Sequence, residues 1–340
     1  MNIEPLTSEF ESAWDDYVLK HTEGALFHRI GWRNLVQRVY RHRPEYWMAI
    51  EDGEIVGVLP LFHVKTWLGG YKLVSIPGGV VGGILAENDR YFTALLELAR
   101  RRAQETGCKY LEMRHQKAVD ISWPVQKRHV NVVIPLREEE AHFKALRGDI
   151  RRCLRRAFEQ DFEIELESDD IQAFFDLYAL GQRNFGTPVE GRAWITGVYN
   201  AFPEAHRISL IKKNGQVVLA KLMRIYKNEV SPVLSYGLPA FRTQYPEHLL
   251  CWEWMKHGHK LGLEYFNFGR SLEGSGPYKF KLGWDGQPQP LHYYYYLREG
   301  VELPDFTQTG TRRQKVARLW KKLPLPLANW LGPKVRRSFP

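Results

Sequence analysis

The segment GCKYLEMR at residues 107–114 recurs as GLEYFNFGR at residues 262–270, and this recurrence decides how the rest of the chain is organised. Both segments have tyrosine as the fourth residue and end on an arginine, and most residues between are apolar or aromatic. Short runs of this kind predict a β-strand. We therefore expect two copies of one unit, at a spacing far longer than the repeat of a solenoid protein.

The segments before each copy follow one order. Two apolar runs flank Asp52-Gly53 in the first half and Asn214-Gly215 in the second, and these dipeptides favour the tight turn of a β-hairpin. Each hairpin is preceded by a helical pattern and followed by a short strand, a loop rich in glycine or proline, and a second helix. The order predicts a mixed α/β (α+β) fold.

The predicted elements have the following bounds. Helices are expected within residues 10–40, from a cap at Asp89 to residue 104, around residues 174–180, and from Pro246 to residue 260. Strands at residues 130–136 and 291–297 are expected to complete the first and the second copy, respectively.

Length and composition are those of a globular protein. The chain has 340 residues, 44% of them hydrophobic, a length that favours two domains, here residues 1–146 and 147–300. The three cysteines have no metal-like spacing, so we expect reduced, buried thiols and assign no metal site. The acidic N-terminus does not resemble a signal peptide, and no apolar run has the length of a membrane span.

Residues 301–340 form a basic tail. Nine lysines or arginines and no acidic residue lie after position 305, whereas residues 1–305 hold 39 of each. Four apolar residues of the tail have the spacing of one helix face (Val316, Leu319, Trp320 and Leu323). This pattern predicts that residues 311–340 bind an anionic membrane surface. The alternative is that the same apolar face packs on the body of the protein.

The stretch NFGRSLEGSGPYKFKLGWDGQPQP at residues 267–290 is the candidate for chemistry. It places arginine, serine, tyrosine, two lysines and tryptophan in a glycine-rich connection after a predicted strand. Loops of this composition often carry function, although a solvated hairpin loop is an equal alternative.

A second basic segment, RGDIRRCLRRA at residues 147–157, marks the predicted boundary between the copies. On a helix, arginines such as Arg152 could hold a phosphate. The alternative is a solvated helix that pairs with the acidic residues that follow it.

Several nucleotide and hydrolase motifs are absent. The chain has no GxxxxGK[ST] motif, and PGGVVGG at residues 77–83 lacks the GxGxxG pattern of dinucleotide-binding proteins. No GxSxG or HExxH motif occurs. The scattered histidines are interpreted as structural residues.

Blocks spread over nearly the whole chain resemble a known family. They are FHRIGWRNLV, the hairpin and glycine loop of residues 53–86, KYLEMR, RNFGTPV, NFGRSLEGSGPYKFKLGW and KKLPLPLANWLGP. Together they are similar to the FemAB-related proteins associated with exosortase/PEP-CTERM systems, which belong to the FemAB-like group of tandem GNAT-fold acyltransferases.

The resemblance implies two tandem GNAT-like domains and transfer of an acyl or aminoacyl group to an amine or hydroxyl of an exopolysaccharide or cell-envelope precursor. Many Fem transferases that use aminoacyl-tRNA carry a long helical arm, and this sequence has no segment long enough for one. We therefore expect acyl-CoA or an acyl carrier protein as co-substrate, without a permanently bound cofactor, and rank tRNA lower. The expected location is the cytoplasmic face of the inner membrane. An aminoacyl-tRNA-dependent enzyme and a non-catalytic scaffold of polysaccharide assembly are the alternatives.

The resemblance also suggests site residues. Phe280-Lys281 matches the FK element near the active cleft of Fem transferases. We assign Lys281 and Arg270 to the developing negative charge or a donor phosphate, and Tyr278 to protonation of the leaving group. The residues expected to bind donor or substrate are Tyr236, Gly237, Ser271, Lys279, Trp284, Arg183, Asn184 and Arg152. The general base stays open among Glu247, His248 and Asp285.

Overall fold

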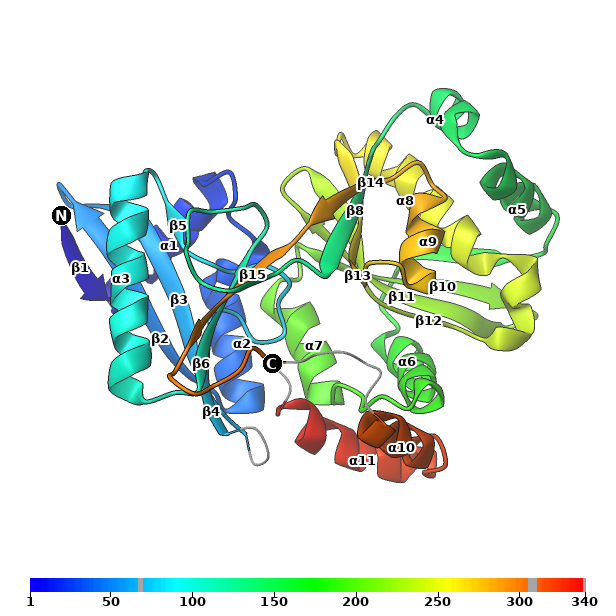
Figure 1. The fold of residues 1–340 in the computed structure, drawn as a ribbon. Coiled ribbons are helices and arrows are strands. Elements are labelled where there is room, and N and C mark those ends of the chain that lie inside the picture. Colours follow the sequence, from blue (N-terminus) through cyan, green and yellow to red (C-terminus); the bar gives the residue numbers. More distant parts are fainter. Residues whose placement is uncertain (67–69, 305–310, 339–340) are drawn as a thin grey trace. The chain divides into compact units, whose positions relative to one another are not determined.

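The computed structural model describes every residue except 67–69, 305–310 and 339–340. The chain forms two compact units (Figure 1). Unit 1 comprises residues 1–128, 290–307 and 334–340, and unit 2 comprises residues 129–289 and 308–333. This division differs from the predicted boundary after residue 146, for a reason that lies in the strand order of the two sheets.

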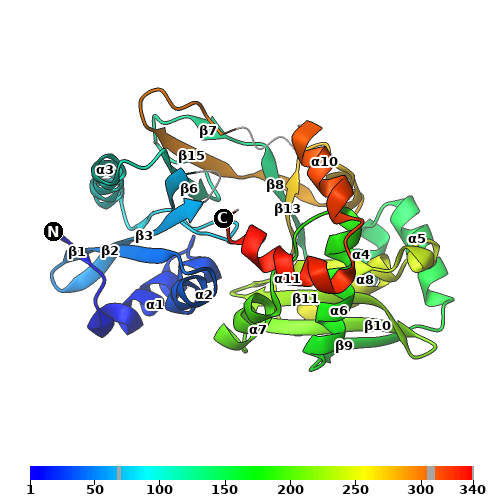
Figure 2. The same cartoon turned by 90° about the horizontal axis from the view of Figure 1, so that it is seen from below.

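Unit 1 is built on a mixed sheet. Its helices are α1 (Glu11–Lys20), α2 (Ile30–Tyr40) and α3 (Asp89–Thr106), with short 3-10 turns η1 (Ser8–Phe10) and η2 (Leu26–His28). Its strands are β1 (Asn2–Pro5), β2 (Arg43–Glu51), β3 (Glu54–Thr66), β4 (Gly70–Val74), β5 (Leu85–Ala86), β6 (Tyr110–His115), β7 (Val125–Gln126) and β15 (His292–Leu297). The sheet order is β1-β2-β3-β4-β6-β15-β7, with β5 paired to β3. Helix α3 covers one face, and α1 and α2 cover the other (Figure 2).

Unit 2 repeats this plan. Its helices are α4 (Glu139–Ala145), α5 (Gly148–Phe158), α6 (Ile171–Phe185), α7 (Arg192–Ala201), α8 (Pro246–Lys260), α9 (Gly276–Leu282), α10 (Thr311–Trp320) and α11 (Leu325–Arg336, to residue 333 in this unit), with a 3-10 turn η3 (Pro239–Gln244). Its strands are β8 (His129–Pro135), β9 (Glu163–Ser168), β10 (His206–Lys213), β11 (Gln216–Tyr226), β12 (Glu229–Gly237), β13 (Tyr265–Leu272) and β14 (Gln287–Pro290). The sheet order is β14-β8-β13-β12-β11-β10-β9.

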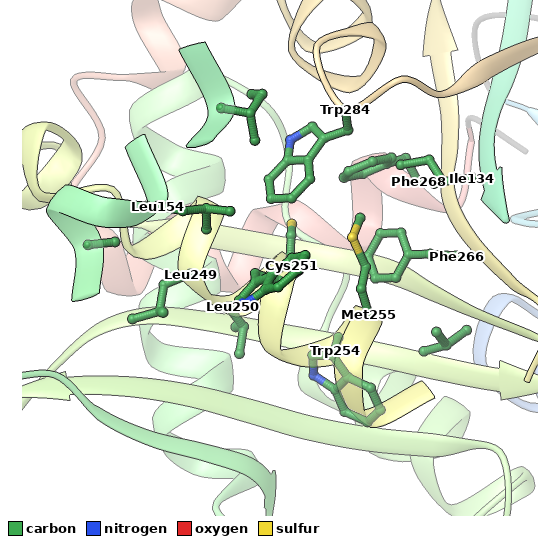
Figure 3. Packing of buried hydrophobic residues seen from close by; sticks show 14 of the residues in the cluster. Ile134, Leu154, Leu249, Leu250, Cys251, Trp254, Met255, Phe266, Phe268 and Trp284 are labelled. Atoms are coloured by element: carbon green, nitrogen blue, oxygen red, sulfur yellow. The ribbon is translucent and has the colours of Figure 1, made fainter. Parts of the chain in front are cut away.

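The core of unit 2 lies between the sheet and α8. Apolar residues of α8 pack against residues of β8, β11 and β13, and α5 adds Leu154 to the same cluster. Figure 3 shows Cys251 and Met255 of α8 directed toward the aromatic rings of Phe266, Phe268 and Trp284. Helix α8 is therefore held firmly on the strands that carry the candidate site.

The predicted repeat is confirmed by element order. Unit 1 runs α1-α2-β2-β3-β4-α3-β6 and unit 2 runs α6-α7-β10-β11-β12-α8-β13. Both predicted hairpin turns are present, since Asp52 and Asn214 have φ of 52° and 51° and the glycine after each also has a positive φ. The cap of α3 is corrected by one residue, because Asn88, not Asp89, accepts the Tyr91 N–H.

The assignment of the last strands was wrong. Strand β8, expected in the first copy, pairs antiparallel with β13 of unit 2, and β15, expected in the second, pairs antiparallel with β6 of unit 1. Chain order suggested the opposite because apolar alternation reveals a strand but not its partner. The two units thus exchange their closing strands, and the boundary falls near residue 129.

The glycine-rich connection is not a hairpin loop. Residues 276–282 form α9, whose first turn is capped by the Ser275 hydroxyl accepting the Tyr278 N–H at 3.3 Å. Pro277 lies in the first turn, where its missing N–H costs nothing. The serine and proline are therefore helix-start signals, and they place Lys279 and Lys281 on a helix.

The tail packs on unit 2. A side chain on Gly186 would lie 2.5 Å from the Ala317 carbonyl of α10, and one on Gly332 of α11 would lie 2.8 Å from the Val189 carbonyl, so both backbones approach closely. Trp320 and Ala328 are buried by this contact. No helix in the described ranges is long and apolar enough to span a membrane.

Candidate active site

Strands β12 and β13 pair only briefly. Their parallel register consists of Glu229 with Tyr265 and Val230 with Phe266. Beyond these pairs β12 continues along β11, and β13 continues along β8 after an irregularity between Asn267 and Arg270. We call this separation, at residues 233–237 and 268–272, the strand divergence. It includes Tyr236, Gly237 and Ser271, three of the residues expected to bind donor or substrate.

Lys281 of α9 reaches back to the strand divergence. Its amine donates to the backbone carbonyls of Gly269, at 2.8 Å, and Arg270, at 3.2 Å. Gly269 has a φ of +70°, a conformation that favours glycine, and this turns its carbonyl out of the regular β13 ladder. Burial lowers the pKa of the Lys281 amine to about 8, and the charges of Lys221 and Arg270 also lower it.

Lys221 of β11 is a site residue that the sequence analysis missed. The side chain is 1% exposed, and its amine donates to Glu247 Oε1 at 2.7 Å and to Cys251 Sγ at 3.2 Å. Burial disfavours the charged amine, but Cys251 and Glu247 together raise its pKa above the usual value. For the Cys251 thiol, burial raises the pKa to about 11. The sequence did hold a signal, because Lys221 interrupts the apolar run VVLAKLM.

Glu247 connects this pair to the strand divergence. The Ser235 hydroxyl of β12 lies 3.4 Å from Glu247 Oε2, while Oε1 contacts Lys221. The Glu247 side chain is 40% exposed, so one side of the carboxylate remains accessible. Of the three candidates for general base, Glu247 is the one with such contacts to β11 and β12.

An aromatic group lies beside Lys281 on α9. Trp284 is fully buried, and its ring lies near those of His248, Phe268 and Phe280. Burial lowers the pKa of His248 to about 4, so the ring is neutral near pH 7. Trp284, predicted to bind substrate, belongs to the core of unit 2, as Figure 3 shows.

Tyr236 of β12 is fixed by α6. Its hydroxyl accepts a hydrogen bond from Asn184 Nδ2 at 3.0 Å, and its ring contacts Phe185 edge to face at 5.5 Å. A side chain on Gly181 would lie 2.2 Å from the ring, so glycine is needed there. The structure therefore joins two predicted residues, Tyr236 and Asn184, at the strand divergence.

The other predicted residues have different positions. Gly237 ends β12 opposite Leu219, Ser271 is buried on β13, and Tyr278 packs partly against the core. Lys279 and Arg270 are exposed. Arg152 is exposed on α5, whereas Arg183 donates to the Lys321 carbonyl that follows α10 and so contacts the tail.

Residues 144–282 match the family model of the acetyltransferase (GNAT) domain. The match covers the strand divergence, Lys221, Glu247 and Lys281. No curated protein matches the chain.

Solved structures share the whole architecture. A structure of FemX is similar with a TM-score of 0.69 at 14% identity, covering 95% of this chain and 100% of that one. L-PGS from Bacillus licheniformis gives a TM-score of 0.55 at 14% identity, covering 94% and 99%. A tandem GNAT protein from the clavulanic acid biosynthesis pathway gives 0.55 at 11% identity, covering 89% and 99%. The chain thus has a tandem GNAT fold, and unit 2 carries an acyltransferase domain.

Proposed function

We propose that this GNAT-fold acyltransferase moves an acyl group from a thioester donor to an amine or hydroxyl of an exopolysaccharide or cell-envelope precursor. The observation that carries the proposal is the position of the Lys281 amine on the Gly269 and Arg270 carbonyls, where β12 and β13 stop pairing. A donor carbonyl placed between the parted strands would meet a preorganised positive charge, which stabilises the negative charge of an acyl-transfer transition state.

Each chemical role then has a candidate residue. The reaction forms a bond from the acceptor nitrogen or oxygen to the acyl carbon and breaks the bond from that carbon to the donor sulfur. An ammonium has three N–H groups, and Lys281 uses two on carbonyls, so the third is assigned to the developing oxyanion. Glu247 accepts the proton of the nucleophile, and Tyr278 gives a proton to the departing thiolate.

The donor is a thioester of CoA or of an acyl carrier protein. Binding of tRNA depends mainly on neutralising phosphates, and residues 1–305 carry equal numbers of basic and acidic residues. A balanced charge supports a donor with few phosphates over charged tRNA. Transfer that RNase abolishes and charged tRNA restores would reverse this preference.

The acceptor follows from the resemblance to FemAB-related proteins of exosortase/PEP-CTERM systems. The fold is also shared with the C-terminal domain of a putative lysylphosphatidylglycerol synthetase from Agrobacterium fabrum, with a TM-score of 0.54 at 13% identity, covering 85% of this chain and 91% of that one. That name indicates a membrane lipid. A lipid-linked precursor at the inner membrane is consistent with the resemblance to FemAB-related proteins and with the lipid in the name of that synthetase.

The tail supports a peripheral position on the cytoplasmic face of that membrane. Four large apolar side chains of α10 and α11 remain exposed, namely Val316 (53%), Leu319 (67%), Leu327 (41%) and Trp330 (60%). Basic residues Lys315, Arg318, Lys321 and Lys322 are exposed on α10 and just after it. Apolar residues among cations suit an anionic lipid surface.

The test of the proposed activity is acyl transfer by the full chain with a panel of acyl-CoA and acyl carrier protein donors, followed by mass spectrometry of extracted envelope precursors. Lys281→Ala is expected to lower the rate by about 100-fold or more, because it removes the charge directed at the oxyanion. Lys260→Ala, an exposed lysine at the end of α8, is the matched control and should leave the rate unchanged. Wild-type turnover by Lys281→Ala would exclude this site.

A further inference from the structure

The start of α8 is a poor site for a pyrophosphate. Helix N-termini bind phosphates through their free N–H groups and the positive end of the helix dipole. Here Pro246 supplies no N–H, and Glu247 places a carboxylate in the first turn, where it pairs with Lys221 at 2.7 Å. A negative charge in this position repels a second anion. CoA, with a pyrophosphate and a further phosphate, would find no cradle there.

Helix α5, which packs on α8 and η3, carries exposed positive charge instead. Its buried side carries Ile150, Leu154 and Ala157. Its other side carries Arg152, Arg155 and Arg156, all exposed, and we call these three residues the arginine face. In the structure as described, no carboxylate lies within ion-pair distance of the arginine face.

The acidic segment after α5 does not neutralise these arginines. Glu165 pairs with Lys212, and Glu167 pairs with Arg207 at 3.1 Å. Asp170 caps α6 by accepting the Ala173 N–H. The alternative, a helix paired with the acidic segment, is therefore not found at these three arginines among the residues that the structure describes, and the positive charge of the arginine face is available to a partner.

Helix α5 separates the arginine face from the candidate active site, because the opposite, buried side of the helix contacts the site. On the buried side of the same helix, Ile150 lies against Gly283, which directly follows α9, since a side chain on that glycine would be 3.3 Å from Ile150 Cδ1. Helix α5 also contacts η3, the turn that links β12 to α8. A partner bound to the arginine face would therefore lie one helix diameter, roughly 10 Å, from the elements on which α5 packs, α8 and η3.

We propose that the arginine face of α5 docks an acyl carrier protein, which delivers the acyl group on its phosphopantetheine arm. This inference rests on the proposed acyl transfer and names its donor. A carrier protein offers an acidic surface to three arginines, and its arm carries a single phosphate, so it needs no pyrophosphate cradle. Transfer RNA would also be attracted to arginine, but it requires phosphate contacts along a longer surface than one face of a three-turn helix.

The test measures binding and turnover separately. Binding of a holo acyl carrier protein from a bacterial type II fatty-acid system is measured by titration calorimetry at low and high salt. The double variant Arg155→Glu/Arg156→Glu is expected to weaken binding at least about tenfold, because it replaces attraction by repulsion. Arg101→Glu, the same exchange at an exposed position of α3, is the matched control and should bind as the wild type does.

Turnover with a short acyl-pantetheine, which has no protein part, separates the two proposals. The double variant should keep wild-type turnover with acyl-pantetheine and lose it with the acylated carrier protein. Equal binding of carrier protein by wild type and double variant, or binding of tRNA but not carrier protein to the arginine face, would overturn the docking proposal. If the carrier protein binds as expected and no thioester is turned over, the proposed transferase reaction fails instead.

Discussion

Lys281 faces four groups that can carry charge. Cys251 and Glu247 of α8, Lys221 of β11 and Arg270 of β13 all affect its titration, and burial of the amine itself is the largest influence on its pKa. The amine is anchored on two carbonyls, so its position does not depend on substrate. A lysine with a pKa of about 8 changes charge within the range in which most enzymes are assayed.

This gives a pH prediction for the transferase. If the charged form of Lys281 stabilises the oxyanion, kcat/KM falls as pH rises through about 8. Lys221→Met removes a neighbouring positive charge, so the pKa of Lys281 should rise and the alkaline limb should move to higher pH. The measurement is the pH profile of kcat/KM for wild type, Lys221→Met and Lys260→Met. If kcat/KM falls at the same alkaline pH in wild type and in Lys221→Met, the two amines are not coupled.

The sequence revealed one of these two lysines. Lys281 stood out because it lies in a glycine-rich, aromatic segment that matches the FK element. Lys221 lies in an apolar strand that reads as core, and its partners Glu247 and Cys251 are 26 and 30 positions away. Contacts between β11 and α8 depend on the tertiary fold, which local sequence patterns do not specify.

At the scale of elements, the docking of the tail depends on two glycines. Gly186 directly follows α6 and has a φ of +76°, and its backbone approaches Ala317 of α10 too closely for a side chain. Gly332 likewise allows α11 to approach Val189. The spacing of apolar residues in the tail predicted one helix around residues 316–323, but neither the second helix, α11, nor which apolar residues face the protein. Trp320 is buried, while Leu319 beside it is 67% exposed.

Gly332→Ala is expected to loosen α11. Its new methyl group would meet the Val189 backbone at 2.8 Å, which should cost about 1–3 kcal/mol of packing. Limited trypsin digestion followed by mass spectrometry should show faster cleavage in the tail, which is rich in lysine and arginine. Gly148→Ala is the control, since nothing lies within 4 Å of a side chain there. Equal cleavage of the two variants would mean that α11 is not held at Gly332.

Membrane binding can be tested without removing the tail. Leu319→Ser/Trp330→Ser changes two exposed residues, and loss of their contact with lipid should weaken binding to anionic vesicles by about tenfold or more. Leu261→Ser, an exposed leucine just after α8, is the control. Sedimentation with anionic and neutral vesicles is the measurement. Equal binding by wild type and double variant, or equal binding to anionic and neutral vesicles, would argue against the tail as the anchor.

At the scale of the whole molecule, buried histidines lower the stability of the fold at acid pH. Burial lowers the pKa of His115 to about 3 and that of His42, His142, His206 and His248 to about 4. These values lie below the ordinary 6.5 of the unfolded chain. The unfolded chain therefore binds protons first as pH falls, and stability is lost below about pH 6.5.

Each of these histidines is expected to cost about 2 kcal/mol at pH 5, so both units should unfold at mildly acid pH. The measurement is the thermal midpoint between pH 7.5 and pH 5. His115→Gln should flatten the acid slope relative to wild type, whereas His259→Gln, at an exposed position, should not. A midpoint that stays constant over this range would contradict the prediction.

The exchange of β8 and β15 has a consequence for how the protein is made. A ribosome completes residues 1–128 early, but the strand that must lie between β6 and β7 is translated only at residues 292–297. The sheet of unit 1 thus stays incomplete, with an unpaired edge at β6, while most of unit 2 is synthesised. During that interval the backbone N–H and C=O groups on that edge have no partner strand, which favours pairing with other chains. A chain cut between the two halves of the sequence would leave each half without its closing strand, since β15 lies in the sheet of unit 1 and β8 in that of unit 2.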